Sequence, residues 1–215
     1  MNLRELIDAF RVEADDRAKP YFSSDQQVID WLNEAEREAC IRARLIHEVV
    51  EISVAAGDPG IVVDPLVIEI FHAQLVDSGG RITELWPTER MEMDRRRRGW
   101  RSETRCPDGY VHDDKSLVLN AIPDADYTLR IEVYRLPDMD MAEVTSAPEI
   151  AEIHHRQLVD WALYRAFSVP DADKFDSKRA GQAEARFERY FGKRPAARVR
   201  RRQHANRPHH NQPCW

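Results

Sequence analysis

The first 47 residues carry apolar side chains at helical spacing in two runs. The first run lies before Pro20, where a helix is expected to end because the residue before proline disfavours helical geometry. The second follows Ser24, a candidate N-cap with Gln27 at the reciprocal capping-box position. The residues of the second helix expected to face water are Arg37, Glu38 and Arg42. The apolar positions of the two helices are Leu3, Leu6, Ile7, Phe10 and Ala14, then Val28, Leu32, Ala35, Ala39, Ala43 and Ile46.

Residues 48–140 change to a period of two and predict an inserted β region. Apolar residues such as Leu129 and Ile131 alternate with polar ones, as in an antiparallel sheet with one face in water. Turn signals rich in Gly, Pro and Asp separate the strands. A short helix is expected after Pro87, running into the arginine run 95–98. The expected strand runs are Val50 to Val54, VVDPLVIEIF (62–71), RITEL (81–85), SLVLNAI (116–122) and YTLRIEVYRL (127–136).

Residues 141–192 return to helical spacing. One helix is expected to begin at Pro148, because proline is favoured in the first turn. The last helix is expected from about Asp173 to Gly192, a natural C-terminal stop. Residues 193–215 form an extended basic tail. The expected fold class is therefore α+β: a helical bundle of two N-terminal and two C-terminal helices, with an inserted antiparallel β region and an extended basic C-terminal tail.

Charge is divided unevenly along the chain. The formal net charge is -6, and residues 193–215 contribute +7 with no acid among them, which leaves -13 for residues 1–192. Such asymmetry predicts a tail that binds an anionic partner, either nucleic acid or an acidic protein surface.

Composition narrows the class of protein further. No apolar run approaches the roughly 18 residues that a membrane helix needs, and the charged N-terminus lacks the apolar segment of a signal peptide. The chain is expected to be soluble and made in a cytoplasm. Cys40, Cys106 and Cys214 are scattered without a Cys-x-x-Cys pair, which argues against a disulfide framework or a zinc ribbon.

The adjacent histidines His154 and His155 raise the question of a metal site. Neighbouring helix residues point about 100° apart, so the two cannot bind one ion as an i, i+4 pair would. Glu152 and His155 match the Glu-x-x-His spacing of di-iron bundles, but such a site needs a second motif and two further glutamates. The other match, Glu69 to His72, lies in an expected strand. Histidines that pack helices or contact another subunit are therefore preferred, and no metal or cofactor is expected.

Enzyme activity is not expected, because no catalytic motif is complete. The acids of Asp113-Asp114 and of Asp138 to Asp140 fall in expected loops without an accompanying His, Lys or glycine-rich phosphate loop. The sequence contains no Gly-x-Ser-x-Gly, Walker loop or Gly-x-Gly-x-x-Gly. These acids are most simply turn formers.

Two arginine clusters are candidate interaction sites. The run 95–98 is flanked by Asp94 and Glu103, which favours a solvated turn or a salt-bridging subunit edge. The tail cluster 198–202 has fewer acids nearby, so it could bind phosphates by charge alone. It could also order on a partner protein, with Trp215 as an apolar contact. A protein partner is favoured over nucleic acid.

Five segments, taken in order, carry a resemblance that covers nearly the whole chain. They are SDQQVIDWLNEAEREACIRARLI, GWRSETRCPDGYVHDD, LVLNAIPDADYTLRIEVYRLP, PEIAEIHHRQLVDWALYRAFSVPDADKFD and AEARFERYFGKRPAARVRRR. Their order and spacing resemble the head-to-tail adaptor (connector) proteins of tailed bacteriophages. No single segment is a chemical signature.

The resemblance implies a non-enzymatic structural virion protein of the neck. It would be a ring subunit, commonly one of twelve, that joins the portal to the tail or nozzle around the DNA channel. The β region would meet tail components or neighbouring subunits. C-terminal segments would reach the portal, which makes candidate portal contacts of Arg198, Arg200, Arg201, Arg202 and Trp215. Candidates for helix packing or subunit contacts are His154, His155, Trp161, Tyr164, Arg95 and Arg97.

DNA would pass through such a ring without sequence-specific binding. The acidic body suits a channel wall, because carboxylates repel phosphates. The alternative is a DNA-binding packaging or regulatory protein that acts through its basic tail, although the acidic body and the lack of a helix-turn-helix or finger weigh against it. A metal-dependent bundle enzyme is a third class, which bound iron or zinc would reveal.

Overall fold

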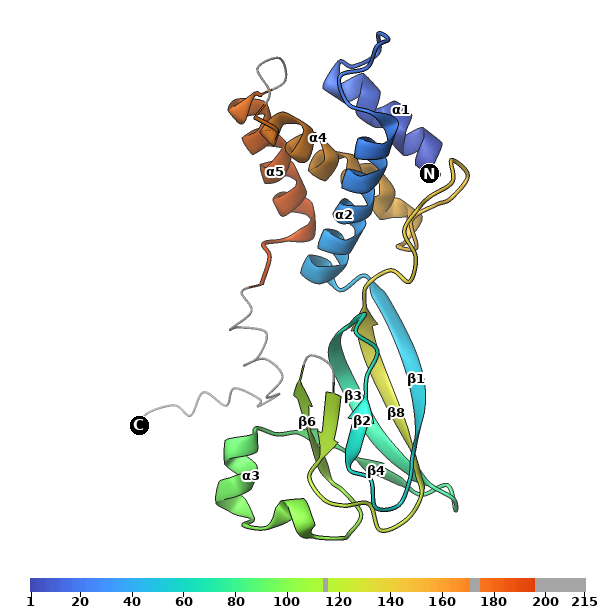
Figure 1. Cartoon of the computed structure of the whole chain (residues 1–215), viewed down its shortest axis with the longest axis vertical. Coiled ribbons are helices and arrows are strands. Elements are labelled where there is room, and N and C mark those ends of the chain that lie inside the picture. The colour runs from blue at the N-terminus through green and yellow to red at the C-terminus, as the bar shows by residue number, and fades with distance from the viewer. Residues whose placement is uncertain (114–115, 171–174, 196–215) are drawn as a thin grey trace, which may run out of the picture. The chain divides into compact units, whose positions relative to one another are not determined.

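The computed structural model describes residues 1–113, 116–170 and 175–195, which fall into two compact units (Figure 1). The helical unit contains residues 1–46 and 135–195, and the β unit contains residues 47–134. The described residues form five α-helices and two four-stranded sheets, so the predicted α+β class is confirmed. No helix in the described ranges is long and apolar enough to cross a membrane.

The helical unit has two helices before the β unit and two after it, as predicted. Ser24 caps the second helix, and the Ser24 and Gln27 side chains each accept the other residue's backbone N–H, which confirms the capping box. A second capping box, which sequence reasoning did not identify, joins Asn2 and Glu5 at the first helix. The elements are α1 (Leu3–Ala14), α2 (Asp25–Ala43), the 3₁₀ helix η2 (Glu152–Gln157), α4 (Leu158–Ser168) and α5 (Ser177–Phe191).

Helix α4 packs against α1, α2 and α5 in the centre of the helical unit (Figure 1). Trp161 of α4 lies between Tyr164 and Phe187, with ring centroids 5.1 Å and 5.0 Å away. Phe10 of α1 packs on Trp31 of α2 at 6.1 Å. Of these rings, Phe10, Trp31, Trp161 and Phe187 are buried, so contacts between aromatic side chains help to hold the four helices together.

Two polar side chains on the buried side of α2 hold the chain where it returns from the β unit. Asn33 donates to the Met141 carbonyl at 3.0 Å and accepts the Met141 N–H at 2.9 Å. Glu36 accepts the N–H groups of Glu149 and Ile150 at 2.6 Å and 3.2 Å. Both side chains are buried, so these bonds satisfy backbone groups that water does not reach.

The predicted starts of the last two helices were wrong. The helix expected from Pro148 begins at Glu152 as 3₁₀ turns and becomes α-helical at Leu158, because Glu36 binds the two N–H groups that follow Pro148 and Ala151 has an extended ψ of 141°. The last helix begins at Ser177, and the Asp176 carboxylate accepts the N–H groups of Lys178 and Arg179 at 3.0 Å each. Asp173 lies outside the described residues, while the stop at Gly192 is confirmed.

The prediction that Glu38 and Arg42 face water was also wrong, whereas Arg37 is exposed as expected. The Arg42 side chain is 4% exposed and lies over the rings of Trp161 and Phe187, 5.1 Å from each centroid. Its Nε lies 3.5 Å from a carboxylate oxygen of Glu38. A buried arginine is tolerated here because a carboxylate and two aromatic faces replace its contacts with water.

The β unit contains two sheets whose apolar faces share one core. The strand orders are β1-β8-β3-β4 and β2-β7-β6-β5, and the β5–β6 pair is parallel. Leu75 and Leu129 of one sheet and Leu117 and Leu119 of the other are fully buried in the same cluster. The strands are β1 (Ile46–Val54), β2 (Gly60–Val62), β3 (Val67–Asp77), β4 (Ile82–Glu84), β5 (Trp86–Pro87), β6 (Gly109–Asp113), β7 (Ser116–Leu119) and β8 (Tyr127–Arg135).

Most of the predicted strand runs are present, with two differences. The run VVDPLVIEIF is divided between β2 and β3, because the Asp64 side chain accepts the Leu66 N–H at 2.8 Å in a turn at Pro65. Strands β5 and β6 were not predicted from the sequence. The alternation in β8 and the short helix α3 (Arg90–Arg96), followed by the 3₁₀ turn η1 (Trp100–Ser102), are as the pattern indicated.

Replacing Asn33 with alanine should destabilise the helical unit. The change leaves the N–H and carbonyl groups of Met141 without a partner, so the free energy of unfolding should fall by about 2 kcal/mol or more. Urea unfolding followed by helical circular dichroism measures the loss. Gln26→Ala is the matched control on the exposed side of α2, where a change within about 0.5 kcal/mol is expected. Equal losses for the two variants would contradict this role of Asn33.

Glu36→Gln should reveal a pH-dependent cost of the buried carboxylate. Burial raises the pKa of Glu36 above its ordinary value of 4.5, despite the two backbone N–H groups that it accepts. Between 4.5 and the raised pKa, the folded chain binds more protons than the unfolded chain, so this group's contribution to stability falls as pH rises. Glutamine keeps the acceptor oxygen and does not titrate. Urea unfolding from pH 4.5 to 7 should show the wild type losing stability relative to the variant. A constant or opposite difference would argue against this cost.

Candidate functional site

The two histidines lie in η2 and pack elements of the helical unit together. His155 is buried, with Nδ1 2.9 Å from the Met1 carbonyl oxygen and Nε2 2.8 Å from the Ile150 carbonyl oxygen. His154 lies 3.1 Å from the Tyr190 hydroxyl and contacts the Phe191 ring of α5. Both ring nitrogens of His155 therefore bind backbone of the same unit. The structure gives the pair a packing role inside one chain.

The described residues hold no group of three or more His, Cys, Asp or Glu side chains that could bind a metal ion. Glu152, the other half of the Glu-x-x-His spacing, pairs with the Met1 amino group at 2.9 Å. Cys40 and Cys106 are free thiols, and burial raises the pKa of Cys40 to about 12, so its thiol stays protonated at neutral pH. Neither the histidine pair nor these thiols form a site with evident chemistry.

The other helix residues singled out from the sequence are Trp161 and Tyr164. Trp161 is buried against Phe187, while Tyr164 is half-buried beside it. Trp161 is therefore a core residue of the helical unit, and Tyr164 keeps part of its surface accessible for another chain.

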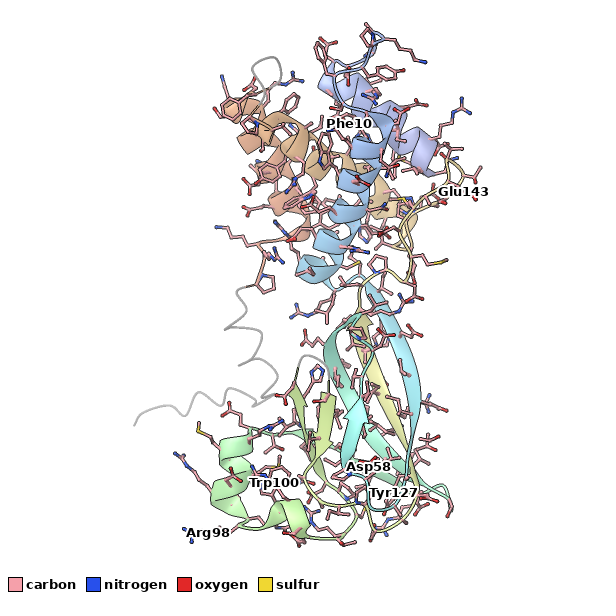
Figure 2. The ribbon with its side chains drawn as sticks, in the orientation of Figure 1. Phe10, Asp58, Arg98, Trp100, Tyr127 and Glu143 are labelled. Carbon is pink, nitrogen blue, oxygen red and sulfur yellow. The ribbon has the colours of Figure 1, made fainter. Side chains whose placement is uncertain are left out.

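The arginine run 95–98 lies at the end of the short helix α3 and in the turn that follows it, at the edge of the β unit (Figure 2). Met93, Trp100 and Val111 form a small buried cluster beneath it. The Trp100 indole N–H donates to Asp94 at 2.9 Å, and Arg101 both pairs with Asp94 and lies 4.3 Å from the Trp100 ring centroid. The side-chain hydrogen bonds from Arg101 and then Trp100 hold the pKa of Asp94 below its ordinary value.

Most arginines of this segment are neutralised by nearby acids. Five of the seven arginines between residues 90 and 105 form ion pairs; their partners are Asp113 for Arg90, Glu92 for Arg96, Glu103 for Arg97, Asp94 for Arg101 and Asp108 for Arg105. Arg95 and Arg98 are exposed and pair with no acid in the described part of the chain. Figure 2 shows Arg98 at the outer edge of the segment. The sequence pattern indicated a salt-bridged edge but could not identify these two remaining cations.

Sequence reasoning missed a pocket in the β unit, because its walls come from three separate segments. Residues 69–73 of β3, residues 84–87 and Tyr110 of β6 enclose about 230 Å³. On this side β4 pairs with β3 only from Gln74 to Val76, so the earlier residues of β3 remain available to line the pocket. Phe71 and Trp86 are 61% and 62% exposed, and together they place two large apolar side chains at one solvent-accessible site.

The pocket walls combine carboxylates with aromatic rings. Glu69 and Glu84 lie beside Phe71, Trp86 and Tyr110. Burial and, to a lesser degree, the Glu69 carboxylate raise the pKa of Tyr110 to about 12, which agrees with Glu69 lying near this ring. Glu84 forms no ion pair with any described residue. The pocket therefore has acidic character and apolar walls.

A glycine lets the strand that carries Trp86 approach the sheet. A Cβ atom on Gly109 would lie 3.0 Å from the Trp86 carbonyl oxygen and 3.0 Å from the Thr88 and Asn120 side chains. Gly109 pairs with Trp86 across the parallel β5–β6 contact, and the Trp86 N–H donates to the Asp108 carbonyl at 3.2 Å. These backbone contacts position Trp86, which lines the pocket.

The proposed portal contacts cannot be placed. Arg198, Arg200, Arg201, Arg202 and Trp215 all lie outside the described residues. The described chain ends at Pro195, close to where Arg42 donates to the Gly192 carbonyl at 3.3 Å and Arg194 pairs with Glu38 at 3.3 Å. The origin of the tail is therefore held against α2.

Comparison with known proteins identifies the family. The family model described as SU10 adaptor protein matches residues 1–210. No curated protein matches the chain. Among solved structures, a chain of "Neck of empty GTA particle computed with C6 symmetry" is 15% identical, with 89% of this chain and 91% of that chain covered and a TM-score of 0.29. A TM-score this low does not carry the arrangement of that particle over to this protein. Because the family model spans nearly the full length, the chain belongs to the SU10 adaptor protein family.

Proposed function

We propose that this protein is the head-to-tail adaptor of a phage-like particle, located in the neck. Membership of an adaptor family, whose role is structural and not enzymatic, is the observation that carries the proposal. In this role many copies form a ring, commonly of twelve, that joins the portal to the tail or nozzle around the DNA channel. The segments 1–47 and 141–192 supply the ring wall, residues 48–140 meet neighbours or tail components, and residues 193–215 reach the portal.

The charge distribution supports this role. Residues 1–192 carry a net charge of -13, which suits a wall past which DNA slides without sequence-specific binding. The helical unit offers a stable base for such a wall, because its polar backbone groups at the chain return are bonded to Asn33 and Glu36. Tyr164, His154 and the arginines Arg95 and Arg97 retain exposed or half-buried surface that contacts between subunits would use.

The tail is the proposed portal contact. It carries the cluster Arg198, Arg200, Arg201 and Arg202 and ends at Trp215, and these residue types are frequent where one protein surface binds another. Arg42 donates a hydrogen bond to the Gly192 carbonyl, so the chain is held in place where the tail begins.

The full chain should add a ring layer to purified portal rings from the same genome, and a chain ending at Gly192 should not. Loss of the tail removes the arginine cluster and Trp215, which supply the docking contacts. Size-exclusion chromatography and negative-stain imaging measure the added layer. Arg200→Gln with Arg201→Gln should weaken binding about tenfold, whereas the control pair Arg4→Gln with Arg17→Gln, exposed residues of the helical unit, should not.

The same preparation separates the adaptor from a DNA-binding protein. A DNA binder would shift duplex DNA at moderate salt, with an affinity that falls steeply as salt rises and disappears in the chain ending at Gly192. If neither chain binds portal rings and the full chain shifts DNA in this way, the adaptor proposal fails and the nucleic-acid function replaces it.

A further inference from the structure

The pocket of the β unit has the size of a site for one side chain. Its volume of about 230 Å³ lies below the roughly 300–1,000 Å³ that small-molecule pockets usually enclose. Its walls offer two carboxylates, Glu69 and Glu84, beside the rings of Phe71 and Trp86. A guanidinium group uses both kinds of wall at once, because it binds carboxylates through a planar fork and stacks on aromatic faces. The chemistry of the pocket therefore fits an arginine.

The same unit carries two arginines that lack an acidic partner. Arg95 and Arg98 are exposed, and the acids of their own segment are already paired with Arg96, Arg97 and Arg101. Neither Arg95 nor Arg98 lines the pocket of its own chain. The segment that carries them packs into the β unit through the buried side chains of Met93 and Trp100.

We propose that Arg95 or Arg98 of one copy inserts into the Glu69–Glu84 pocket of the next copy, with Met91 packing on Trp86. This inference rests on the proposed ring and names one contact that closes it. Met91 is 68% exposed and lies one helical turn from Arg95, so the two share a side of α3. Arginine, methionine and tryptophan are enriched in interface cores, which agrees with their combination here.

The two surfaces are different patches on one chain, and this decides the symmetry of the contact. A contact between unlike patches repeats from copy to copy and produces a ring when its rotation closes, whereas a two-fold dimer buries the same patch twice. The acidic pocket of one copy and the arginines Arg95 and Arg98 of another also attract each other electrostatically at a distance, which guides the copies into one orientation. The proposed contact is therefore of the type that a ring subunit needs.

Charge reversal tests the contact on the full-length protein. Glu84→Arg, and separately Arg95→Glu with Arg98→Glu, should raise the concentration for half-maximal assembly about tenfold or more, measured by mass photometry with and without portal rings. The triple variant that combines all three changes should return to within about threefold of wild type. Reversing Glu51 and Arg130, a weak exposed pair 3.9 Å apart, is the matched control and should leave assembly unchanged. Unfolding curves establish that each variant is folded.

Cross-linking identifies the occupant of the pocket directly. Copies with Glu84→Cys are mixed under mild oxidation with copies that carry either Arg95→Cys or Arg98→Cys, with Cys106 and Cys214 replaced by serine in all of them. A disulfide between unlike copies is expected for at least one of the two positions. In a second arm, Cys214 is retained in the Glu84→Cys copies. A disulfide from residue 84 to Cys214 in that arm, without one to residue 95 or residue 98, would identify the basic tail as occupant and overturn the proposal.

The outcomes separate this inference from the proposed function. Rings that form on the portal with unchanged assembly in every reversal variant overturn the contact and leave the adaptor function standing. Failure of the wild-type protein to form any oligomer, alone or on portal rings, overturns both. Weakening by each single-sided reversal together with recovery in the triple variant supports the contact.

Discussion

The bonds from Asn33 and Glu36 of α2 to the returning chain are the interaction on which the helical unit depends. Residues 47–134 are inserted between the two halves of this unit, so the second half packs on the first only after the chain has left the unit and returned to it. Closing a chain over such a distance costs conformational entropy. Paired bonds to Met141, and to Glu149 and Ile150, fix where the chain returns and where η2 and α4 can start. The Glu36 carboxylate stabilises this arrangement through its hydrogen bonds, although its burial costs desolvation free energy.

Local signals made much of the fold predictable from the sequence. Ser24 with Gln27, the stop at Gly192 and the alternation in β8 act within a few residues, and the structure contains all three. The failures involve partners that are distant in sequence. The helix expected from Pro148 does not start there, because Glu36 binds the N–H groups that follow. Arg42 was expected to be exposed, but aromatic rings of α4 and α5 pack against it. The pocket was not predictable for the same reason, since three segments meet there only after folding.

The arginine segment shows why a count of charges is a poor guide to a partner. Four consecutive arginines suggest a phosphate-binding surface, yet acids within the same unit neutralise two of them. The two cations left for a partner are Arg95 and Arg98, on a segment that packs into the β unit through Met93 and Trp100. A binding partner must present acidic groups at positions that match these two cations, whereas a flexible basic segment can bind any anionic surface. In the proposed adaptor, the acidic body and the paired arginines would together reduce nonspecific attraction to DNA.

The position of Arg42 also limits how far the tail can extend. Arg42 donates to the Gly192 carbonyl, and Arg194 pairs with the buried Glu38, so the chain is held by these contacts up to about Pro195. The twenty residues from 196 to 215 can span at most about 66 to 72 Å when fully extended. Any surface that Trp215 contacts must therefore lie within that radius of Pro195. In the proposed adaptor, Arg42 and Glu38 of the helical unit would therefore fix the point from which a contact made by Trp215 is measured.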